Sequence, residues 1–499
     1  MKKLSVIILL LFVAACATKK EKTPQPNIVF IFADDMTHTA INALGNSEIQ
    51  TPNLDRLADQ ATTFTHAYNM GAWNGAVCAA SRAMLISGRS VWNVDEFRQG
   101  WLEGRDLDKT WGRLMENAGY ETYMTGKWHV DAPADSVFQN VQHVRPGMPG
   151  DAWDHDRMVA QFSKLNETGG SADDLMPVGY NRPLSEDDST WSPTDEKFGG
   201  YWEGGTHWSE VLKVDALGFI DQAEKSDKPF FMYLSFNAAH DHRQAQQEYL
   251  DMYPLEKISL PKSWLPMYPF KDSIGNGRSL RDEALAPFPR TEFATKTHIK
   301  EYYALITHMD EQIGKIIDRL ESIGKIDNTY IIFTSDHGMA MGRHGLLGKQ
   351  TQFDHSIRPP FMIVGPDVPQ GNKIDADIYL QDAMATSLEI AGVTKPDYVF
   401  FNSVMDLVKG KQDKSHYNAI YGGYINLQRM IRKDGYKLIA YPKLNKVLLF
   451  DMENDPEEMN DLASDEKFHA KVKELFNDLI QLQEQMNDQM DLKDIYQNL

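Results

Sequence analysis

Asn27-Ile-Val-Phe-Ile-Phe-Ala-Asp-Asp35 and Thr329-Tyr-Ile-Ile-Phe-Thr-Ser-Asp-His-Gly338 are the stretches that most strongly indicate the fold. Each is a near-continuous apolar run that ends in acidic residues. Such runs are typical of strands buried on both faces, as in a parallel sheet. Two further strands are predicted at Glu121–Thr125 and Pro229–Phe236.

Helical patterns separate these strands. Thr51 and Pro52 begin one of them, as N-cap and first helical residue, and another runs from about Lys300 to Ile323. Strands that alternate with helices predict an α/β fold, with a large, mostly parallel central sheet flanked by helices. The polar stretches 131–210 and 255–295 are interpreted as long loops near the edge that carries the site.

The last hundred residues differ in character. Short strands are expected at Ala419–Tyr424, Gln428–Arg432, Tyr436–Tyr441 and Val447–Asp451, and a helical tail from about Asp465. We therefore predict a main domain over 27–395 and a smaller C-terminal α+β subdomain, with a short antiparallel sheet, over 396–499.

Reactive side chains follow all four main strands. In open α/β sheets the ligand site lies beyond the carboxyl ends of the strands, so these segments are expected to meet. They contribute Asp34 and Asp35, then Lys127 and His129, then His240, and finally Asp336 and His337.

The three carboxylates predict a cation site. Asp34, Asp35 and Asp336 would repel one another strongly unless a cation joined them, and an oxygen-rich set suits Ca²⁺, with Mg²⁺ as a second possibility. His337 is expected as a fourth ligand. The alternative for His337 is a structural histidine that bonds a neighbouring carboxylate.

Positive groups accompany this site. Arg82, Lys127 and Lys349 offer donors to a tetrahedral oxyanion, although Lys349 alone would also fit a solvated loop. His129 and His240 can transfer protons near neutral pH. Together they predict a metal-assisted site for a sulfuryl or phosphoryl group.

The N-terminus is interpreted as a targeting segment. Lys2 and Lys3 precede a short apolar run and then Cys16, which indicates a lipoprotein signal over 1–15, lipidation of Cys16 and a tether over 16–26. An ordinary signal peptide cut near Ala15 is the alternative. We expect an exported bacterial lipoprotein, anchored to a membrane in the periplasm or at the cell surface.

Charge and cysteine content narrow the function. With 51 Lys and Arg against 71 Asp and Glu, the net charge of −20 argues against nucleic acid as a partner. It leaves an anionic substrate possible, because a pocket can be locally positive. Only two cysteines occur, so lipidation of Cys16 leaves Cys78 with no disulfide partner. Cys78 is expected to begin a helix, and it is either an inert core thiol or a functional one.

Cys78-Ala-Ala-Ser-Arg-Ala-Met-Leu-Ile-Ser-Gly-Arg89 resembles the signature of type I sulfatases, within the alkaline phosphatase superfamily. The resemblance runs from about residue 27 to about 465, through the acidic and basic strand ends above, Thr51–Ala58 and Gly348-Lys349. Ala80 stands where proline is commonest, and His337 where many members have asparagine. An alkaline-phosphatase-like sandwich is the implied fold.

The resemblance implies roles for these residues. Cys78 would be oxidised to formylglycine by a formylglycine-generating or anaerobic sulfatase-maturating enzyme, and its hydrate would attack sulfur. Asp34, Asp35, Asp336 and His337 would hold calcium, which also contacts residue 78. Arg82 and Lys127 would bind the sulfate. His240, with Lys349, would protonate the departing alcohol, and His129 would take a proton from the second hydroxyl.

The segments 239–245 and 278–290 resemble sulfatases that act on polysaccharides. Sulfated marine glycans or their oligosaccharides are therefore the expected substrates, ulvan ahead of fucoidan, carrageenan and glycosaminoglycans. Candidate contacts to sugar carboxylates or neighbouring sulfates are His242, Arg243, His355 and Arg358, with surface ion pairs as the alternative. Two other functions stay open: a phosphonate monoester or phosphodiester hydrolase, and a catalytically inactive glycan-binding lipoprotein.

Overall fold

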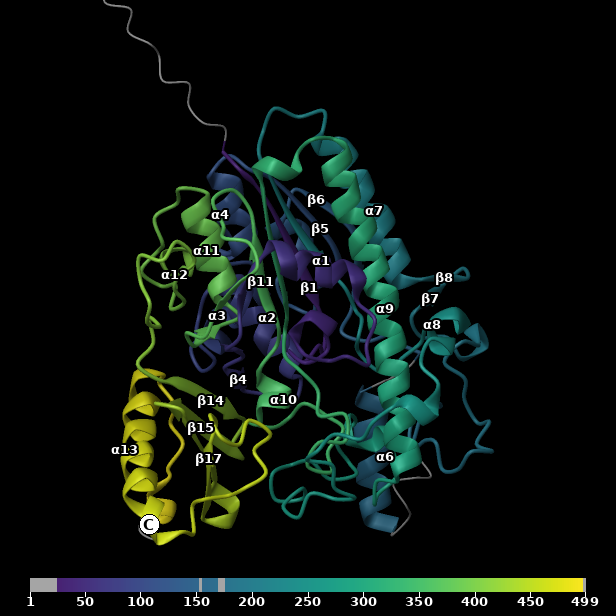
Figure 1. Cartoon of the computed structure of the whole chain (residues 1–499), viewed down its shortest axis with the longest axis vertical. Helices are drawn as coiled ribbons and strands as arrows, with labels where there is room; N and C mark the ends of the chain where they lie inside the picture. Colours follow the sequence, from purple (N-terminus) through teal and green to yellow (C-terminus); the bar gives the residue numbers. More distant parts are fainter. Residues whose placement is uncertain (1–24, 152–154, 169–175, 497–499) are drawn as a thin grey trace, which may run out of the picture.

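The computed structural model describes residues 25–151, 155–168 and 176–496. Its centre is an eight-stranded sheet in which β10, β1, β9, β5 and β6 run parallel (Figure 1). Two antiparallel pairings, of β10 with β11 and of β11 with β2, extend it. In spatial order the strands are β12 (Asn372–Ile374), β2 (Thr62–Phe64), β11 (Phe361–Val364), β10 (Thr329–Ser335), β1 (Asn27–Ala33), β9 (Phe230–Ser235), β5 (Glu121–Lys127) and β6 (Asn140–Arg145).

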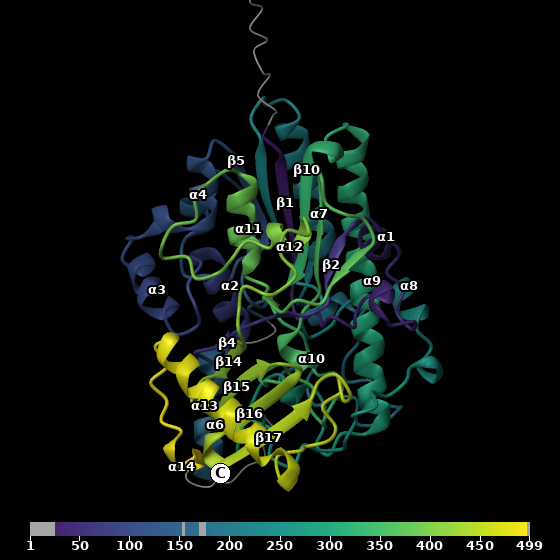
Figure 2. The same cartoon turned by 60° about the vertical axis from the view of Figure 1, so that its left-hand side comes forward.

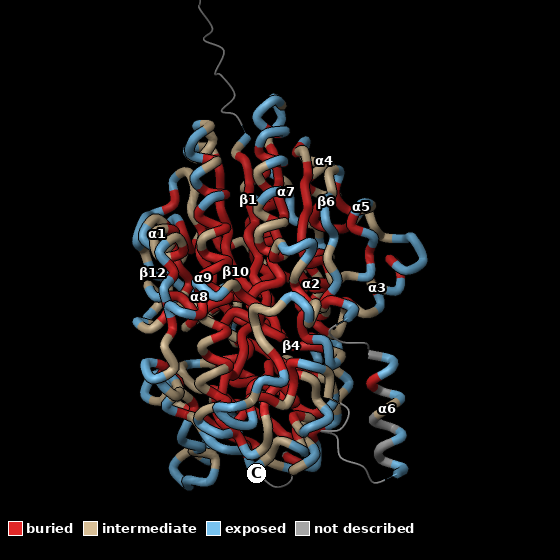
Figure 3. The backbone as a smooth tube through the Cα atoms, turned by 90° about the vertical axis from the view of Figure 1, so that its right-hand side faces the viewer, coloured by how far each residue is buried: buried red, intermediate tan, exposed pale blue. Residues whose placement is uncertain are grey.

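The central strands are buried on both faces, which explains their apolar sequences (Figure 3). In β1 the side chains alternate: Phe30 and Phe32 join one hydrophobic cluster, whereas Val29 and Ile31 join the other. Helices α1 (Pro52–Gln60), α7 (Trp208–Ala223) and α9 (Glu292–Ser322) cover the second cluster. Helices α2 (Val77–Ser87), α4 (Trp111–Asn117) and α11 (Asp382–Ile390) cover the first. The predicted α/β class is confirmed.

A smaller sheet lies below the main one (Figure 2). Its order is β17 (Lys446–Asp451), β16 (Tyr436–Tyr441), β15 (Gln428–Lys433), β14 (Ile420–Tyr424) and β4 (Gly71–Ala72). The four C-terminal strands are antiparallel, as predicted, but β4 comes from far upstream and pairs parallel with β14. The first hydrophobic cluster includes side chains of both sheets and of α13 (His469–Gln485), so one core joins them.

Several elements differ from the sequence predictions. The stretch 131–210 is not all loop, because β6 forms the edge of the main sheet and α6 (His155–Thr168) follows it. β6 lacks an apolar run because most of it is half-exposed or exposed. The remaining elements are short: α3 (Val94–Leu102), α5 (Ala134–Val137), α8 (Gln247–Asp251), α10 (Asp354–Ile357), α12 (Met405–Val408), α14 (Lys493–Tyr496), and the pairs β3 (Ala67–Tyr68) with β13 (Ile378–Tyr379) and β7 (Trp202–Glu203) with β8 (Thr206–His207).

Two helix starts also differ. Thr51 precedes α1, but its side chain makes no capping bond. Instead the Asp310 carboxylate, from α9, accepts the N–H groups of Asn53 and Leu54. α9 begins at Glu292 rather than near Lys300, after an N-cap in which Thr291 accepts the Ala294 N–H.

The predicted signal, the lipidated Cys16 and most of the tether lie outside the described residues. Across the part of the chain that is described, no helix combines the length and the apolar character that a membrane crossing needs.

Candidate active site

The carboxyl ends of four adjacent strands bring the predicted groups together. β10, β1, β9 and β5 are neighbours, and their register aligns Ala33 with Ser335 and Gly126 with Ser235. The segments that follow therefore leave the sheet at one edge. The side chains gathered there are Asp34, Asp35, Arg82, Lys127, Asp336, His337 and Lys349.

Cys78 lies in the first turn of α2 and is almost fully buried. Its sulfur is 3.2 Å from Lys349 Nζ, 3.4 Å from His337 Nε2 and 3.9 Å from Asp35 Oδ1. A helix N-terminus adds a further positive potential. Cys78 is thus a member of the charged cluster. These surroundings differ from those of an inert thiol in an apolar core.

Each carboxylate of the cluster faces a cation. Lys127 Nζ bonds Asp34, Lys349 Nζ lies 2.7 Å from both oxygens of Asp35, and Arg82 Nε lies 3.0 Å from Asp336 Oδ2.

Further bonds fix the Arg82 guanidinium, which donates to the Lys127 carbonyl at 3.0 Å and to Ser235 Oγ at 2.6 Å. All of these side chains are buried, so their positions are strongly determined.

The donor set also fits a divalent cation. Asp34, Cys78, Asp336 and His337 each offer a ligand atom within 4.8 Å of the others. Asp34 Oδ1 is buried without a hydrogen-bond partner. Burial and the Asp336 charge raise the pKa of Asp34 well above its usual range, although Lys127 opposes this. A cation bound by these oxygens would remove the unfavourable charge.

The backbone at Asp35 is held in an unusual conformation, with φ of 61°. Its N–H donates to Asp336 Oδ1 at 3.1 Å. Tyr302, from α9, donates its hydroxyl to the Asp35 carbonyl at 2.7 Å and accepts the Thr37 N–H at 3.1 Å. These bonds stabilise a left-handed turn that aims the carboxylate at Cys78.

The cluster shifts the acidity of its members. Burial alone would raise the pKa of the Cys78 thiol, but Lys127, Lys349 and His337 hold it well below its usual range. Burial also opposes protonation of His337, yet Asp336, Cys78 and Asp35 raise its pKa to about 9. An anion at position 78 is therefore favoured by its surroundings.

The two predicted proton-transfer histidines flank the cluster. His240 Nε2 lies 3.8 Å from Asp35 Oδ2, and its Nδ1 is 2.7 Å from the Asp241 carbonyl. His129 has φ of 54° and a buried Nδ1 without a partner. Burial lowers the pKa of His129, although a hydrogen bond to Cys78 opposes the shift. The His129 ring is thus neutral near pH 7 and can accept a proton.

The sequence did not single out Arg281. Its guanidinium lies 3.4 Å from His240 Nε2 and bonds the buried carboxylates of Asp241 and Asp282. Burial would raise the pKa of Asp241, but Arg281 and His240 hold it well below its usual range. The only sequence signal was indirect, because Arg281 belongs to the stretch 278–290 that resembles polysaccharide sulfatases.

The four candidate specificity residues divide into two pairs. His242 packs against Tyr180, Trp191 and Tyr201, and its two ring nitrogens are buried without hydrogen-bond partners. Arg243 is buried beside His298. Neither is an exposed ion pair.

His355 and Arg358 line a different cavity. Arg358 Nε donates to the Thr65 carbonyl at 2.7 Å, and His355 stacks on Phe353. These two side chains are therefore not part of the Cys78 cluster.

Two family models match large parts of the chain. The family model described as "Sulfatase" matches residues 26–393, and that described as "N-sulphoglucosamine sulphohydrolase, C-terminal" matches 342–485. An arylsulfatase of Clostridium perfringens is 29% identical over 468 residues, which are 90% of this chain and 92% of the relative. An ulvan-active sulfatase of Formosa agariphila is 26% identical over 492 residues, 96% and 85% of the two chains.

A solved structure provides the same fold. It is described as a complex with its substrate D-glucosamine-2-N,6-O-disulfate, and it superposes with a TM-score of 0.68 at 22% identity, over 93% of this chain and 99% of the other. Because the sulfatase family model covers most of the chain, including every member of the Cys78 cluster, the chain belongs to the sulfatase family, whose enzymes hydrolyse sulfuric esters.

Proposed function

We propose that this sulfatase removes sulfate from a sulfated polysaccharide or its oligosaccharides, with ulvan as the leading candidate. The ulvan-active relative, aligned over almost the whole chain, supports that substrate class. The observation that carries the proposal is the position of Cys78, with its sulfur 3.2 Å from Lys349 and 3.4 Å from His337 inside a buried cluster of carboxylates and cations.

We propose that Cys78 is converted to formylglycine, whose hydrate supplies an oxygen nucleophile for sulfur. A maturating enzyme, either formylglycine-generating or anaerobic, would be the partner for this step. The surroundings of Cys78 suit the modified residue, because Lys127, Lys349 and His337 stabilise negative charge at this position.

Asp34, Asp35, Asp336 and His337 would hold Ca²⁺, or Mg²⁺, beside residue 78. The cation would supply Lewis-acid stabilisation of negative charge.

The chain's other residues would orient and protonate the substrate. Lys127 and Arg82 present cationic groups that can bind sulfate oxygens. His240 would donate a proton to the departing sugar oxygen, a role supported by its Nδ1 facing the Asp241 carbonyl and its Nε2 facing the cluster. His129, whose pKa is lowered by burial, would accept a proton.

The direct test is mass spectrometry of the peptide that contains Cys78, from protein made in its native host. Conversion lowers the peptide mass by about 18 Da. An unmodified thiol in active protein would exclude the formylglycine mechanism. Initial rates on an aryl sulfate and an aryl phosphate diester would then separate sulfatase action from phosphodiester or phosphonate hydrolysis.

We also propose that the protein is an exported lipoprotein anchored through Cys16, in keeping with a substrate too large to enter a cell. Metabolic labelling with a fatty acid, compared between the native protein and Cys16→Ala, would test the anchor. Label retained in the variant would contradict it.

A further inference from the structure

Two cavities adjoin behind the loop that follows β1. The larger has a volume of about 300 Å³ and the smaller of about 80 Å³. Both are lined by Thr37, Thr39, Arg343 and Glu457, so they adjoin, and we call the two together the Arg343 groove. Cys78 and the cations of its cluster do not line it.

The small end of the groove holds hydrogen-bonding atoms without partners. Thr37 Oγ1, His38 Nδ1 and His355 Nε2 are buried and bond nothing. Thr37 is only 3% exposed and His355 only 5%, so bulk water does not provide hydrogen-bond partners for these atoms. Unpartnered buried groups are uncommon and costly, which points to a ligand at this position.

The charge at the small end suits an oxyanion. Arg343 and Arg358 both line it, although the Arg358 guanidinium already pairs with Asp354 at 3.3 Å and donates to the Thr65 carbonyl, so Arg343 is the cation more available to a ligand. Of the three described acidic residues that line this end, Asp354 and Glu458 are already bonded by Lys437, and the third is Glu457.

The histidines at this end can donate to such a ligand. Burial lowers the pKa of His38 well below its usual range, and the charge of Arg358 adds to the shift. Burial lowers the pKa of His355 in the same way, and there the charge of Arg343 contributes. Each neutral ring carries one N–H that can bond an anion.

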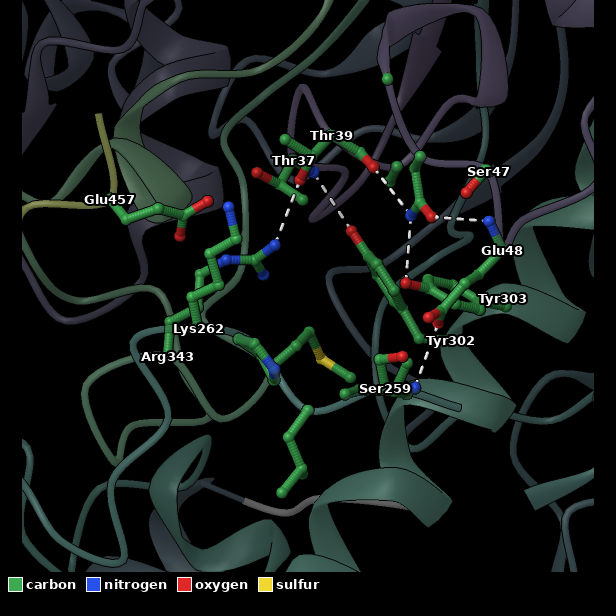
Figure 4. A pocket seen from close by; sticks show the side chains of 17 residues that line it. Thr37, Thr39, Ser47, Glu48, Ser259, Lys262, Tyr302, Tyr303, Arg343 and Glu457 are labelled. Atoms are coloured by element: carbon green, nitrogen blue, oxygen red, sulfur yellow. Dashed lines mark hydrogen bonds between the residues drawn. The ribbon is translucent and has the colours of Figure 1, made fainter. Parts of the chain in front are cut away.

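The large end suits a sugar ring. Its volume lies at the lower limit for small-molecule sites, which are typically about 300–1,000 Å³. Figure 4 shows Tyr302 and Tyr303 together on one wall, with Arg343 and Glu457 across the cavity. Aromatic rings with polar tips pack on sugar faces, and carboxylates accept sugar hydroxyls.

The hydroxyl and amide groups of that wall are already ordered. Asn46 Nδ2 donates to the Tyr303 hydroxyl at 3.0 Å, and the Ser259 N–H donates to Glu48 at 3.2 Å. Preorganised polar groups of this kind favour binding, because little side-chain entropy remains to be lost.

We propose that the Arg343 groove is an accessory subsite for an anionic sugar unit of the glycan, distinct from the unit whose sulfate is removed. The sulfate or carboxylate of that unit would bond Arg343, Thr37, His38 and His355, and its ring would lie along Tyr302 and Tyr303. This inference rests on the proposed glycan substrate. Tyr302 joins the two sites, since its hydroxyl bonds both Asp35 and Thr37.

A free sulfate ion is the other source of the same chemistry, but it would need only the small end. The cavities share four residues, and Lys262 adds a second cation in the large end. An extended ligand with separated polar groups would contact the polar side chains at both ends of the groove, whereas an ion would contact those at one end only.

The test compares Arg343→Gln with the native enzyme on an aryl sulfate and on a sulfated ulvan oligosaccharide. Loss of one charge-assisted bond is expected to raise KM for the oligosaccharide about tenfold more than KM for the aryl sulfate. Lys262→Ala should act in the same direction with a smaller factor. Arg113→Gln is the matched control and should change neither, because Arg113 lies on α4 and pairs with Glu116 on the same helix.

Direct binding separates this inference from the proposed function. In a Cys78→Ala background, calorimetric titration of the oligosaccharide should show weaker binding for Arg343→Gln, whether or not the native enzyme turns that glycan over. Equal affinity, or an equal rise of KM on both substrates, would overturn the subsite. If Arg343→Gln lost affinity for inorganic sulfate while its affinity for the oligosaccharide stayed unchanged, the groove would be a site for the free ion. That result would also overturn the subsite.

Discussion

The Cys78 cluster and the Arg343 groove lie on either side of Tyr302, yet they are built differently. In the cluster each carboxylate already faces a cation: Asp34 meets Lys127, Asp35 meets Lys349, and Asp336 meets Arg82. In the groove, donors such as Thr37 Oγ1 and His355 Nε2 face no partner. The first region is preorganised for chemistry, and the second is incomplete until something binds.

The difference follows from the elements that supply each region. The cluster is attached to parallel strand ends and to the first turns of α2, whose positions are fixed by sheet register and core packing. The groove is lined mainly by loops around residues 37–48, 259–262 and 341–343, and α9 supplies the wall that contains Tyr302 and Tyr303. Reaction centres need precise geometry, and rigid elements provide it better than loops do.

Removing the nucleophile should have the largest effect. Cys78→Ala deletes the group at the centre of the cluster, and we expect kcat/KM on an aryl sulfate to fall at least about 10⁴-fold. The melting temperature should change by less than about 4 °C, because the side chain loses only one buried atom. Retained activity in this variant would show that the cluster is not organised around residue 78.

Removing the cation should come next. A chelator is expected to lower activity at least about 100-fold, and added Ca²⁺ should restore it, because Asp34, Asp336 and His337 offer converging ligands. Asp336→Asn should lose activity that Ca²⁺ does not restore. Asp382→Asn is a matched control: this carboxyl is buried elsewhere, and burial raises its pKa to about 7. Chelator-resistant activity would contradict the cation site.

Arg281 is expected to have a moderate effect. Arg281→Gln removes the cation beside His240 Nε2, and we expect kcat/KM to fall about 10–100-fold, with a shift in the pH profile of kcat. Arg281→Lys should recover part of the loss.

Arg290 provides the control for Arg281. It forms a buried pair with Glu283 in the same stretch, away from His240. Arg290→Gln should therefore destabilise the fold without moving the pH profile. An identical pH profile in Arg281→Gln and the native enzyme would show that Arg281 has only a structural role.

The contrast also explains what could be predicted from the sequence. The strands β1 and β10 were recognisable because both their faces are buried, so each carries a near-continuous apolar run. Their following residues, Asp34 and Asp336, could then be assigned to one edge from the topology of parallel sheets alone. The carboxylates of the cluster were therefore predicted by a short chain of physical reasoning, whereas the role of Cys78 was expected only from the resemblance to sulfatases.

The rest depended on tertiary contacts that leave little local pattern. β6 is an exposed edge strand without an apolar run. Asp310 caps α1 from more than two hundred residues away, a bond that no local motif announces. His355 was predicted as a sugar contact, but its position beside Thr37 and His38 depends on how α10 packs against the loop that follows β1.

The smallest expected effect concerns the stability of the groove at low pH. Burial lowers the pKa of His344, at the small end, to about 4, whereas an unfolded histidine titrates near 6.5. Above pH 6.5 both states are neutral. As the pH falls below 6.5 the unfolded chain binds the proton first, so the free energy of unfolding decreases until the folded pKa is reached.

His344→Gln should flatten this dependence, because glutamine does not titrate. We expect the decrease between pH 7 and pH 5 to be smaller in the variant by about 1–2 kcal/mol, measured by urea unfolding followed with tryptophan fluorescence. His38 and His355 titrate in both proteins, so the difference between the two slopes isolates His344. Parallel slopes would mean that His344 is solvated in the folded state, and that the small end of the groove is open to water rather than shaped for an anion.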